Sequence, residues 1–151
     1  MLGLATSTAS FLRGQWNLAR ELHDYRSGQC GSLRGSARFQ PAPSDDGSSW
    51  LDYQEHGELT FGGHRGPASR SLRYRDLPDG TADVLFSDGR AFYRLDLRAG
   101  RCEAEHLCGA DQYLVCVRVV SGDSFTETWR VTGPAKDYEM TTAYVRTGSL
   151  E

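Results

Sequence analysis

The clearest structural signal in the chain lies at residues 82–97, which read ADVLFSDGRAFYRLDL. On both sides of a central Asp-Gly pair, apolar and aromatic residues recur at every second position, as they do in strands with one buried face. Asp-Gly is a pair that a tight two-residue hairpin turn favours. The stretch therefore predicts two antiparallel strands, Ala82 to Ser87 and Arg90 to Leu97, with Asp88 and Gly89 as a turn rather than as a site.

Segments of the same kind continue along the chain on both sides of this hairpin, separated by turn residues at intervals of about a dozen residues. No segment of ten or more residues has a clean helical periodicity, so parallel strands joined by crossover helices are excluded. We expect one helical turn at Phe11 to Gly14 and a wide turn at 62–67. The predicted strands are 15–23, 32–40, 50–61, 68–77, 82–87, 90–97, 103–108, 112–120, 124–132 and 137–146.

Ten antiparallel strands in one domain have two sheet edges to hide, and closure into a barrel hides both at once. We therefore predict an all-β fold, namely a closed antiparallel up-and-down barrel of about ten strands with a short N-terminal helical turn. The alternative is a two-sheet sandwich, which needs longer connections than these turns provide.

Length and composition point to one globular domain. The 151 residues form a predicted single β-barrel domain, 1–151, with a flexible N-terminus at 1–10 and a probable cloning remnant at 150–151. The net charge is −3 and the 17 Lys and Arg residues are dispersed, so we expect neither nucleic acid nor a membrane surface as a partner. Because the sequence shows no membrane-spanning segment or signal peptide, we expect a cytoplasmic location. The sequence leaves a homodimer open.

The four cysteines, Cys30, Cys102, Cys108 and Cys116, form no Cys-x-x-Cys pair. Free thiols in a reducing compartment are therefore expected, and we predict no metal and no cofactor. The alternative is a metal bound by Cys102 and Cys108 beside His106.

The inward faces of the predicted strands carry more polar side chains than a barrel built only for stability would bury. Residues two apart in a strand point the same way, which draws Glu55 and Arg70 inside on adjacent strands. A buried charge costs several kcal/mol unless it is paired. The residues predicted to line the interior are Tyr53, Glu55, Arg70, Tyr74, His106, Tyr113, Trp129, Tyr138 and Arg146.

This polar interior has two interpretations. The charged and tyrosine side chains either satisfy one another and plug the barrel, or they line a cavity that holds a ligand. Arg70 and Arg146 would suit a carboxylate or phosphate, because a guanidinium offers paired donors in one plane. His106 and Glu55 are the candidate acid or base groups, with Asp111 as a further partner for His106.

Short motifs recur along the chain, namely Phe11-Leu-x-Gly-x-Trp16, Gly35-x-Ala-x-Phe39, Tyr53-x-Glu-x-Gly57, Asp88-Gly-Arg90, His106-x-Cys108-x-x-Asp111-x-Tyr113 and Trp129-x-Val-x-Gly-Pro134-x-Lys-Asp-Tyr138. Together they resemble a family of small, mainly bacterial, lipocalin-like proteins of unknown function, and the resemblance runs from Phe11 to Arg146. The resemblance implies a calycin-like barrel but no activity.

Two further resemblances concern single features. The Gly-x-Trp element at Trp16 is similar to the first-strand motif of lipocalins and fatty-acid-binding proteins, where the Trp closes the base of the barrel. The strand count is similar to nitrobindin-like haem barrels, whose closing strands supply a histidine to the iron. The predicted last strand, 137–146, has no histidine, so only His106 could take that role.

The sequence thus leaves three functional hypotheses. The first is a barrel that binds a small organic, anionic or polar-headed ligand in a polar-aromatic cavity. The second is a small cyclase-, isomerase- or hydratase-type enzyme that uses His106 or Glu55, and the third is an interaction protein whose barrel is plugged. A haem-binding barrel is a further alternative.

Overall fold

The computed structural model describes residues 7–148, which form one short helix and ten strands, so the all-β prediction is confirmed. Alternation of buried and exposed residues runs along most strands, as the sequence pattern predicts. The elements are α1 (Thr8–Leu12), β1 (Gly14–Asp24), β2 (Cys30–Ala42), β3 (Ser49–Phe61), β4 (His64–Asp76), β5 (Ala82–Phe86), β6 (Ala91–Leu95), β7 (Arg101–Cys108), β8 (Asp111–Ser121), β9 (Ser124–Thr132) and β10 (Asp137–Gly148).

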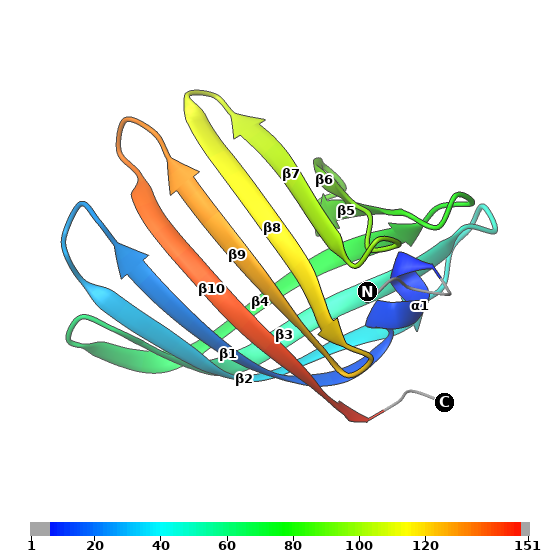
Figure 1. The fold of residues 1–151 in the computed structure, drawn as a ribbon, viewed down its shortest axis with the longest axis horizontal. Coiled ribbons are helices and arrows are strands. Elements are labelled where there is room, and N and C mark those ends of the chain that lie inside the picture. Colours follow the sequence, from blue (N-terminus) through cyan, green and yellow to red (C-terminus); the bar gives the residue numbers. More distant parts are fainter. Residues whose placement is uncertain (1–6, 149–151) are drawn as a thin grey trace.

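The strands form one antiparallel sheet in the order β6-β5-β4-β3-β2-β1-β10-β9-β8-β7. Every strand pairs with a sequence neighbour, and β1 pairs with β10 to join the two halves of the chain. The sheet curls until its two end strands, β6 and β7, lie beside each other (Figure 1), although no ladder joins them in the described part of the chain. The predicted up-and-down barrel is therefore confirmed, and it is nearly closed.

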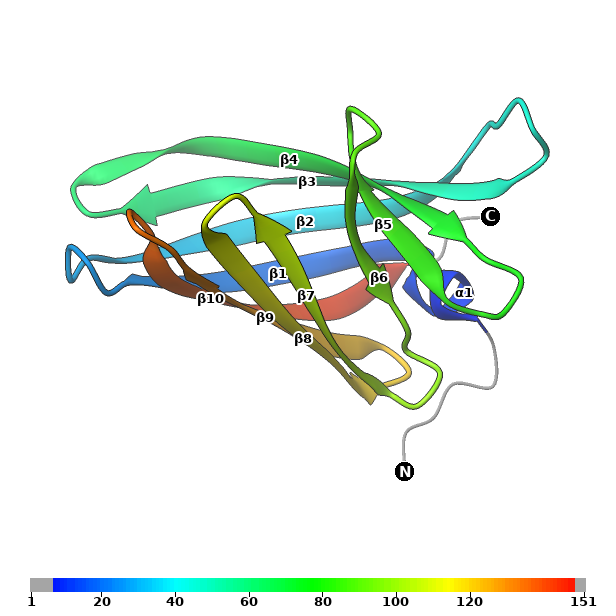
Figure 2. The same cartoon turned by 90° about the horizontal axis from the view of Figure 1, so that it is seen from above.

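The barrel is uneven at its two ends. The strands diverge toward the end that carries the turns at 25–29, 62–63, 109–110 and 133–136, which we call the mouth (Figure 1). Strand β5 pairs only with residues 72–76 of β4, so residues 64–71 pair with β3 alone. Helix α1 lies at the opposite end, the base (Figure 2). A ligand therefore has its widest approach from the mouth.

Trp16 and α1 close the base. The Trp16 side chain is fully buried, and its indole N–H donates to the carbonyl oxygen of Leu12 at 2.8 Å. The Arg146 guanidinium lies 4.2 Å from the Trp16 ring centroid and donates to the carbonyl oxygens of Phe11 and Arg13. These contacts tie the last strand to the helix, so the structural role predicted for Trp16 fits its position.

Three local predictions differ from the structure. The wide turn expected at 62–67 is wrong: β4 begins at His64, and Pro67 is accommodated because this half of β4 is an edge that needs no second ladder. Helix α1 begins at Thr8, three residues before the predicted helical turn. The predicted two-residue turn at Asp88 and Gly89 is a three-residue turn over 87–89, because the hydrogen bond that closes it runs from the Phe86 N–H to the Arg90 carbonyl oxygen. Within it only Gly89 takes a positive φ, 92°.

Some expectations concern residues that the structure does not describe. The cloning remnant proposed at 150–151 and the first six residues of the segment expected to be flexible lie outside residues 7–148. Within that range, no helix is long and apolar enough to span a membrane.

Candidate functional site

A layer of charged side chains crosses the barrel at mid-height, between an apolar core at the base and the mouth. Arg20 on β1 and Glu55 on β3 form its centre, with side chains that are 8% and 3% exposed. Two hydrogen bonds join them, from Nη1 to Oε2 at 2.7 Å and from Nη2 to Oε1 at 2.9 Å. The Arg20 Nε donates to Thr142 Oγ1 at 2.8 Å. The Arg20 guanidinium is thus held on two sides by the protein itself.

Glu55 accepts two further hydrogen bonds, from the Tyr53 hydroxyl at 2.6 Å and from Arg70 Nη2 at 3.2 Å. Burial by itself would raise the pKa of Glu55, but the hydrogen bond from Arg20 and the charges of Arg70 and Arg20 outweigh it and lower the pKa to about 2. Glu55 is therefore an anion at neutral pH and a weak proton acceptor, which argues against its predicted role as a catalytic base.

Two groups of the same layer are buried without a hydrogen-bond partner in the described structure: Nε of Arg70 and Oε1 of Glu127. Glu127 is 6% exposed, whereas the Arg70 side chain is 32% exposed. Burial raises the pKa of Glu127, and the positive charges of Arg70 and Arg20 offset this effect only in part. Buried polar groups are nearly always paired, so these two indicate a place for a ligand.

An aromatic wall lies above this layer and spans the gap between β6 and β7. Phe92 stacks on Trp129 at 4.9 Å between ring centroids, and Phe86 stacks on Phe92 at 4.3 Å. The His106 ring stands edge-on to Phe86, Phe92 and Tyr113 at 5.8, 5.2 and 5.8 Å. Rings from β5, β6, β7, β8 and β9 thus meet where no backbone ladder joins the sheet ends. All but Trp129 are partly exposed.

The mouth contains a pocket of about 260 Å³ on the opposite side of the barrel. Leu22 of β1 and Met140 of β10 are directly paired in the sheet, and both line this pocket. Tyr138, Phe61, His23 and Asp24 complete the lining, so the surface is mostly apolar. The barrel therefore offers apolar walls near solvent and charged groups deeper inside.

The structure brings most of the predicted lining residues into this region. Tyr53, Glu55 and Tyr74 are buried in the core, where Tyr74 packs against Phe39 and Tyr53. The Tyr113 hydroxyl accepts from Lys136 Nζ at 2.8 Å. The predicted residues that share the interior above the base are Tyr53, Glu55, Arg70, Tyr74, His106, Tyr113, Trp129 and Tyr138.

Arg146 is separated from these residues. Its guanidinium lies at the base, stacked on Trp16, and it also donates to Asp123 Oδ1 at 3.1 Å and to the Gly122 carbonyl oxygen at 3.2 Å. Its donors hold the helix and the β8–β9 turn, so nothing in its surroundings suits it to contact a ligand in the mouth.

Arg20 and Glu127 belong to the charged layer but were not among the residues predicted to line the interior. The signal for both was present in the alternation of the strands. Trp16, Leu18 and Arg20 share one face of β1, and Phe125, Glu127 and Trp129 share one face of β9. The alternation places the residues inside, but it does not indicate that Arg20, rather than Arg70, is the main partner of Glu55.

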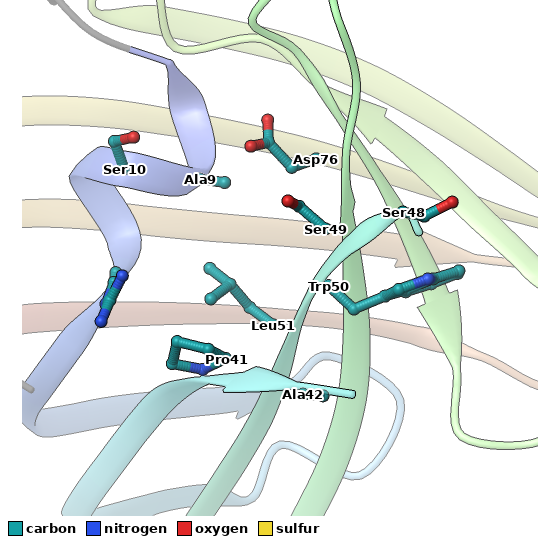
Figure 3. A pocket seen from close by; sticks show the side chains of 10 residues that line it. Ala9, Ser10, Pro41, Ala42, Ser48, Ser49, Trp50, Leu51 and Asp76 are labelled. Atoms are coloured by element: carbon teal, nitrogen blue, oxygen red, sulfur yellow. The ribbon is translucent and has the colours of Figure 1, made fainter. Parts of the chain in front are cut away.

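A second hollow, of about 230 Å³, lies beside α1 (Figure 3). Ala9 and Ser10 face Leu51, Ser49 and Asp76 across it. Burial raises the pKa of Asp76, but this carboxyl group is only partly buried, and most of the polar lining is exposed. The charged layer of the barrel is the stronger candidate, because its unpaired groups are shielded from solvent.

The side chains around His106 do not form the metal site that Cys102, Cys108 and His106 were considered for. Within residues 7–148, no three His, Cys, Asp or Glu side chains are placed to hold a metal ion. Cys108 is exposed, and the His106 ring is surrounded by Phe86, Phe92 and Tyr113. The haem alternative stays a prediction, with His106 as its one candidate ligand.

Comparison with known proteins assigns the chain to a family. The model of DUF6314, a family of unknown function, matches residues 12–146, and the chain belongs to this family. No curated protein matches it. The resemblance to a family of unknown function is thus confirmed, and a lipocalin-like barrel fits the structure at a coarse level.

Solved structures resemble the chain to different degrees. The S-type phycobiliprotein lyase CPES from Guillardia theta has a TM-score of 0.74 at 10% identity, over 97% of this chain and 96% of that chain. At this identity the likeness shows the fold alone. The redesigned barrel mFAP1 bound to DFHBI has a TM-score of 0.48 at 16% identity, over 93% of this chain and 100% of that chain. A DUF3598 protein from Nostoc punctiforme has a TM-score of 0.48 at 12% identity, over 96% of this chain and 51% of that chain.

Proposed function

We propose that this member of the DUF6314 family is a binding protein for a small aromatic ligand with one anionic group, held in the mouth of the barrel. The observation that carries the proposal is Arg70, an inward-facing arginine whose charge the protein leaves only partly paired. Its one side-chain hydrogen bond in the described structure goes to Glu55 at 3.2 Å, and its buried Nε has no partner. Arginine offers five donors in a plane that fits carboxylate, sulfonate or phosphate oxygens.

The comparison with Arg20 supports this role for Arg70. Arg20 uses Nε, Nη1 and Nη2 within the protein and is 8% exposed. Arg70 is 32% exposed, and it donates one hydrogen bond to the same Glu55 carboxylate, which is longer than the two from Arg20. Arg20 therefore neutralises Glu55, and the donors of Arg70 remain available to an anion that enters from the mouth.

The walls support an aromatic body for the ligand. The aromatic wall presents the partly exposed rings of Phe86, Phe92, His106 and Tyr113, and Leu22 and Met140 provide apolar contact on the other side. Flat rings gain both apolar burial and stacking in such a place. An aromatic anion matches the walls and the charged layer at the same time.

Two fluorescent probes that differ in one group test the proposal. Anilinonaphthalene sulfonate carries the anion, and N-phenylnaphthylamine is the same aromatic body without it. We expect both to bind the wild-type chain, and we expect Arg70→Gln to weaken only the sulfonate, by about 10- to 100-fold, as loss of a charged hydrogen bond of roughly 1.5–3 kcal/mol implies. Fluorescence titration measures both affinities.

Arg34→Gln is the matched control, because Arg34 is an exposed arginine on β2. It should leave both probes unchanged. Circular dichroism and the urea midpoint of each variant verify that the barrel is folded. Equal loss of both probes in Arg70→Gln, or no binding of either probe to the wild type, would overturn the proposal.

A further inference from the structure

Glu127 is a charged residue of the barrel interior with a buried, unpaired carboxylate oxygen. It lies on β9 between the inward-facing residues Phe125 and Trp129, and it is directly opposite Thr142 of β10 and Val117 of β8. It is 6% exposed, and its Oε1 has no hydrogen-bond partner in the described structure. The Thr142 hydroxyl oxygen accepts from Arg20 Nε at 2.8 Å, and no hydrogen bond joins the Thr142 hydroxyl to Oε1 of Glu127 in the described structure.

The ionisable groups that act on Glu127 come from most of the strands around it. Two are cations, one is a second carboxylate, and three are tyrosines. They are Arg20 of β1, Glu55 of β3, Arg70 and Tyr74 of β4, Tyr93 of β6 and Tyr144 of β10. The three tyrosines are buried, and burial raises the pKa of each one. At neutral pH they are uncharged, so the charge balance depends on four residues.

The net charge of these four residues depends on the protonation state of Glu127 alone. Arg20 and Arg70 are always cations, and Glu55 is an anion because its pKa is lowered to about 2. An ionised Glu127 would make the layer neutral, whereas a protonated Glu127 would leave it with one positive charge. Burial favours the protonated form: desolvation of the carboxyl group outweighs the charges of the two guanidinium groups and the hydrogen bonding from Trp129, and Oε1 has no hydrogen-bond partner in the described structure.

We propose that Glu127 holds a proton in the free barrel and thereby sets the charge of the ligand that the site accepts. This inference rests on the proposed function and refines it. With Glu127 neutral, the layer carries one net positive charge, and a ligand with one negative charge balances it. The Glu127 O–H is then also available as a hydrogen-bond donor, so a neutral carboxyl group and Arg70 both favour an anion.

The inference predicts how ligand binding depends on pH. Raising the pH removes the proton from Glu127, neutralises the layer and places a second carboxylate near the bound anion. The affinity for an anion then falls as the pH rises, approaching tenfold per pH unit above the pKa of Glu127. A neutral ligand of the same shape should show no such fall, because it does not sense the charge.

The test is titration of both probes from about pH 6 to about pH 9, a range in which the sulfonate does not titrate. We expect the sulfonate affinity of the wild type to fall with pH and the N-phenylnaphthylamine affinity to stay constant. Glu127→Gln keeps a neutral side chain of the same shape, so it should bind the sulfonate at low pH as the wild type does and show no fall. Glu21→Gln, an exposed position on β1, is the matched control.

A measurement without ligand separates this inference from the proposed function. The infrared carbonyl band of a protonated carboxylic acid should be present in the wild type near neutral pH, absent in Glu127→Gln and unchanged in Glu21→Gln. If the band is present but neither probe binds, the proposed function fails and the protonated state of Glu127 stands. If the band is absent, or if it disappears as the pH rises while the sulfonate affinity of the wild type stays constant, the inference is overturned even though the barrel binds.

Discussion

A single carboxylate, Glu55, holds the charged layer together. It accepts hydrogen bonds from Arg20, Arg70 and Tyr53, and its side chain is 3% exposed. We expect Glu55→Gln to lower the free energy of unfolding by roughly 3–5 kcal/mol, because it leaves the buried Arg20 guanidinium without its counter-charge. Urea denaturation followed by circular dichroism measures this. Glu58→Gln, which breaks an exposed ion pair with Arg65, should cause no measurable change.

The pH dependence of stability gives the sign of the Glu55 contribution. The pKa of Glu55 falls from 4.5 to about 2 on folding, so its ionised form stabilises the fold above about pH 4.5 and the benefit is lost as the pH falls toward about 2. The folded barrel with Glu55→Gln should lack this loss. A wild-type and a variant curve of the same slope across this interval would contradict the lowered pKa of Glu55 in the folded barrel.

Strands β2 and β3 approach closely at a pair of facing glycines. Gly35 is directly opposite Gly57, and a Cβ added at Gly35 would lie 2.6 Å from the Gly57 Cα and still closer to the His56 carbonyl oxygen. We expect Gly35→Ala to cost roughly 1–3 kcal/mol, because backbone rather than a mobile side chain must shift. Gly63→Ala is the control, since nothing lies within 4 Å of its added Cβ and it needs no positive φ. Equal urea midpoints for the two variants would contradict the close approach.

The strands show how much of the fold could be predicted from the sequence pattern. Alternation placed nearly every strand to within a few residues, because each strand has one buried face. It failed at the start of β4, since Gly66 and Pro67 follow the turn at 62–63 closely and resemble a continuation of that loop. Pro67 is tolerated there because this part of β4 is an edge. The inward face of Glu55 and Arg70 was also predictable. The preference of Glu55 for Arg20 was not, because it depends on side-chain reach across β1, β2 and β3.

Across the whole barrel, closure is achieved by side chains where the backbone leaves it incomplete. The order of strands follows from short connections between antiparallel neighbours, and it could be predicted. The gap between β6 and β7 could not be predicted, because it depends on how the five-residue strand β5 pairs with a much longer β4 and how β6, also of five residues, pairs with β5. The stack of Phe86, Phe92 and Trp129 covers this gap. The same rings therefore serve as part of the wall and of the candidate site.

This arrangement predicts which part of the barrel opens most readily. Strands β6 and β7 each have one ladder neighbour, whereas β1, β2, β3 and β10 have two. In hydrogen exchange followed by mass spectrometry, we expect amides at 91–95 and 101–108 to exchange well before those of β1 and β10, because a one-sided ladder frays locally. Bound N-phenylnaphthylamine should slow exchange at β6 and β7 more than at the α1 end, since it packs against the aromatic wall. Uniform protection of all ten strands without ligand would mean that a β6–β7 ladder closes the barrel in solution, and the aromatic wall would then line a sealed interior.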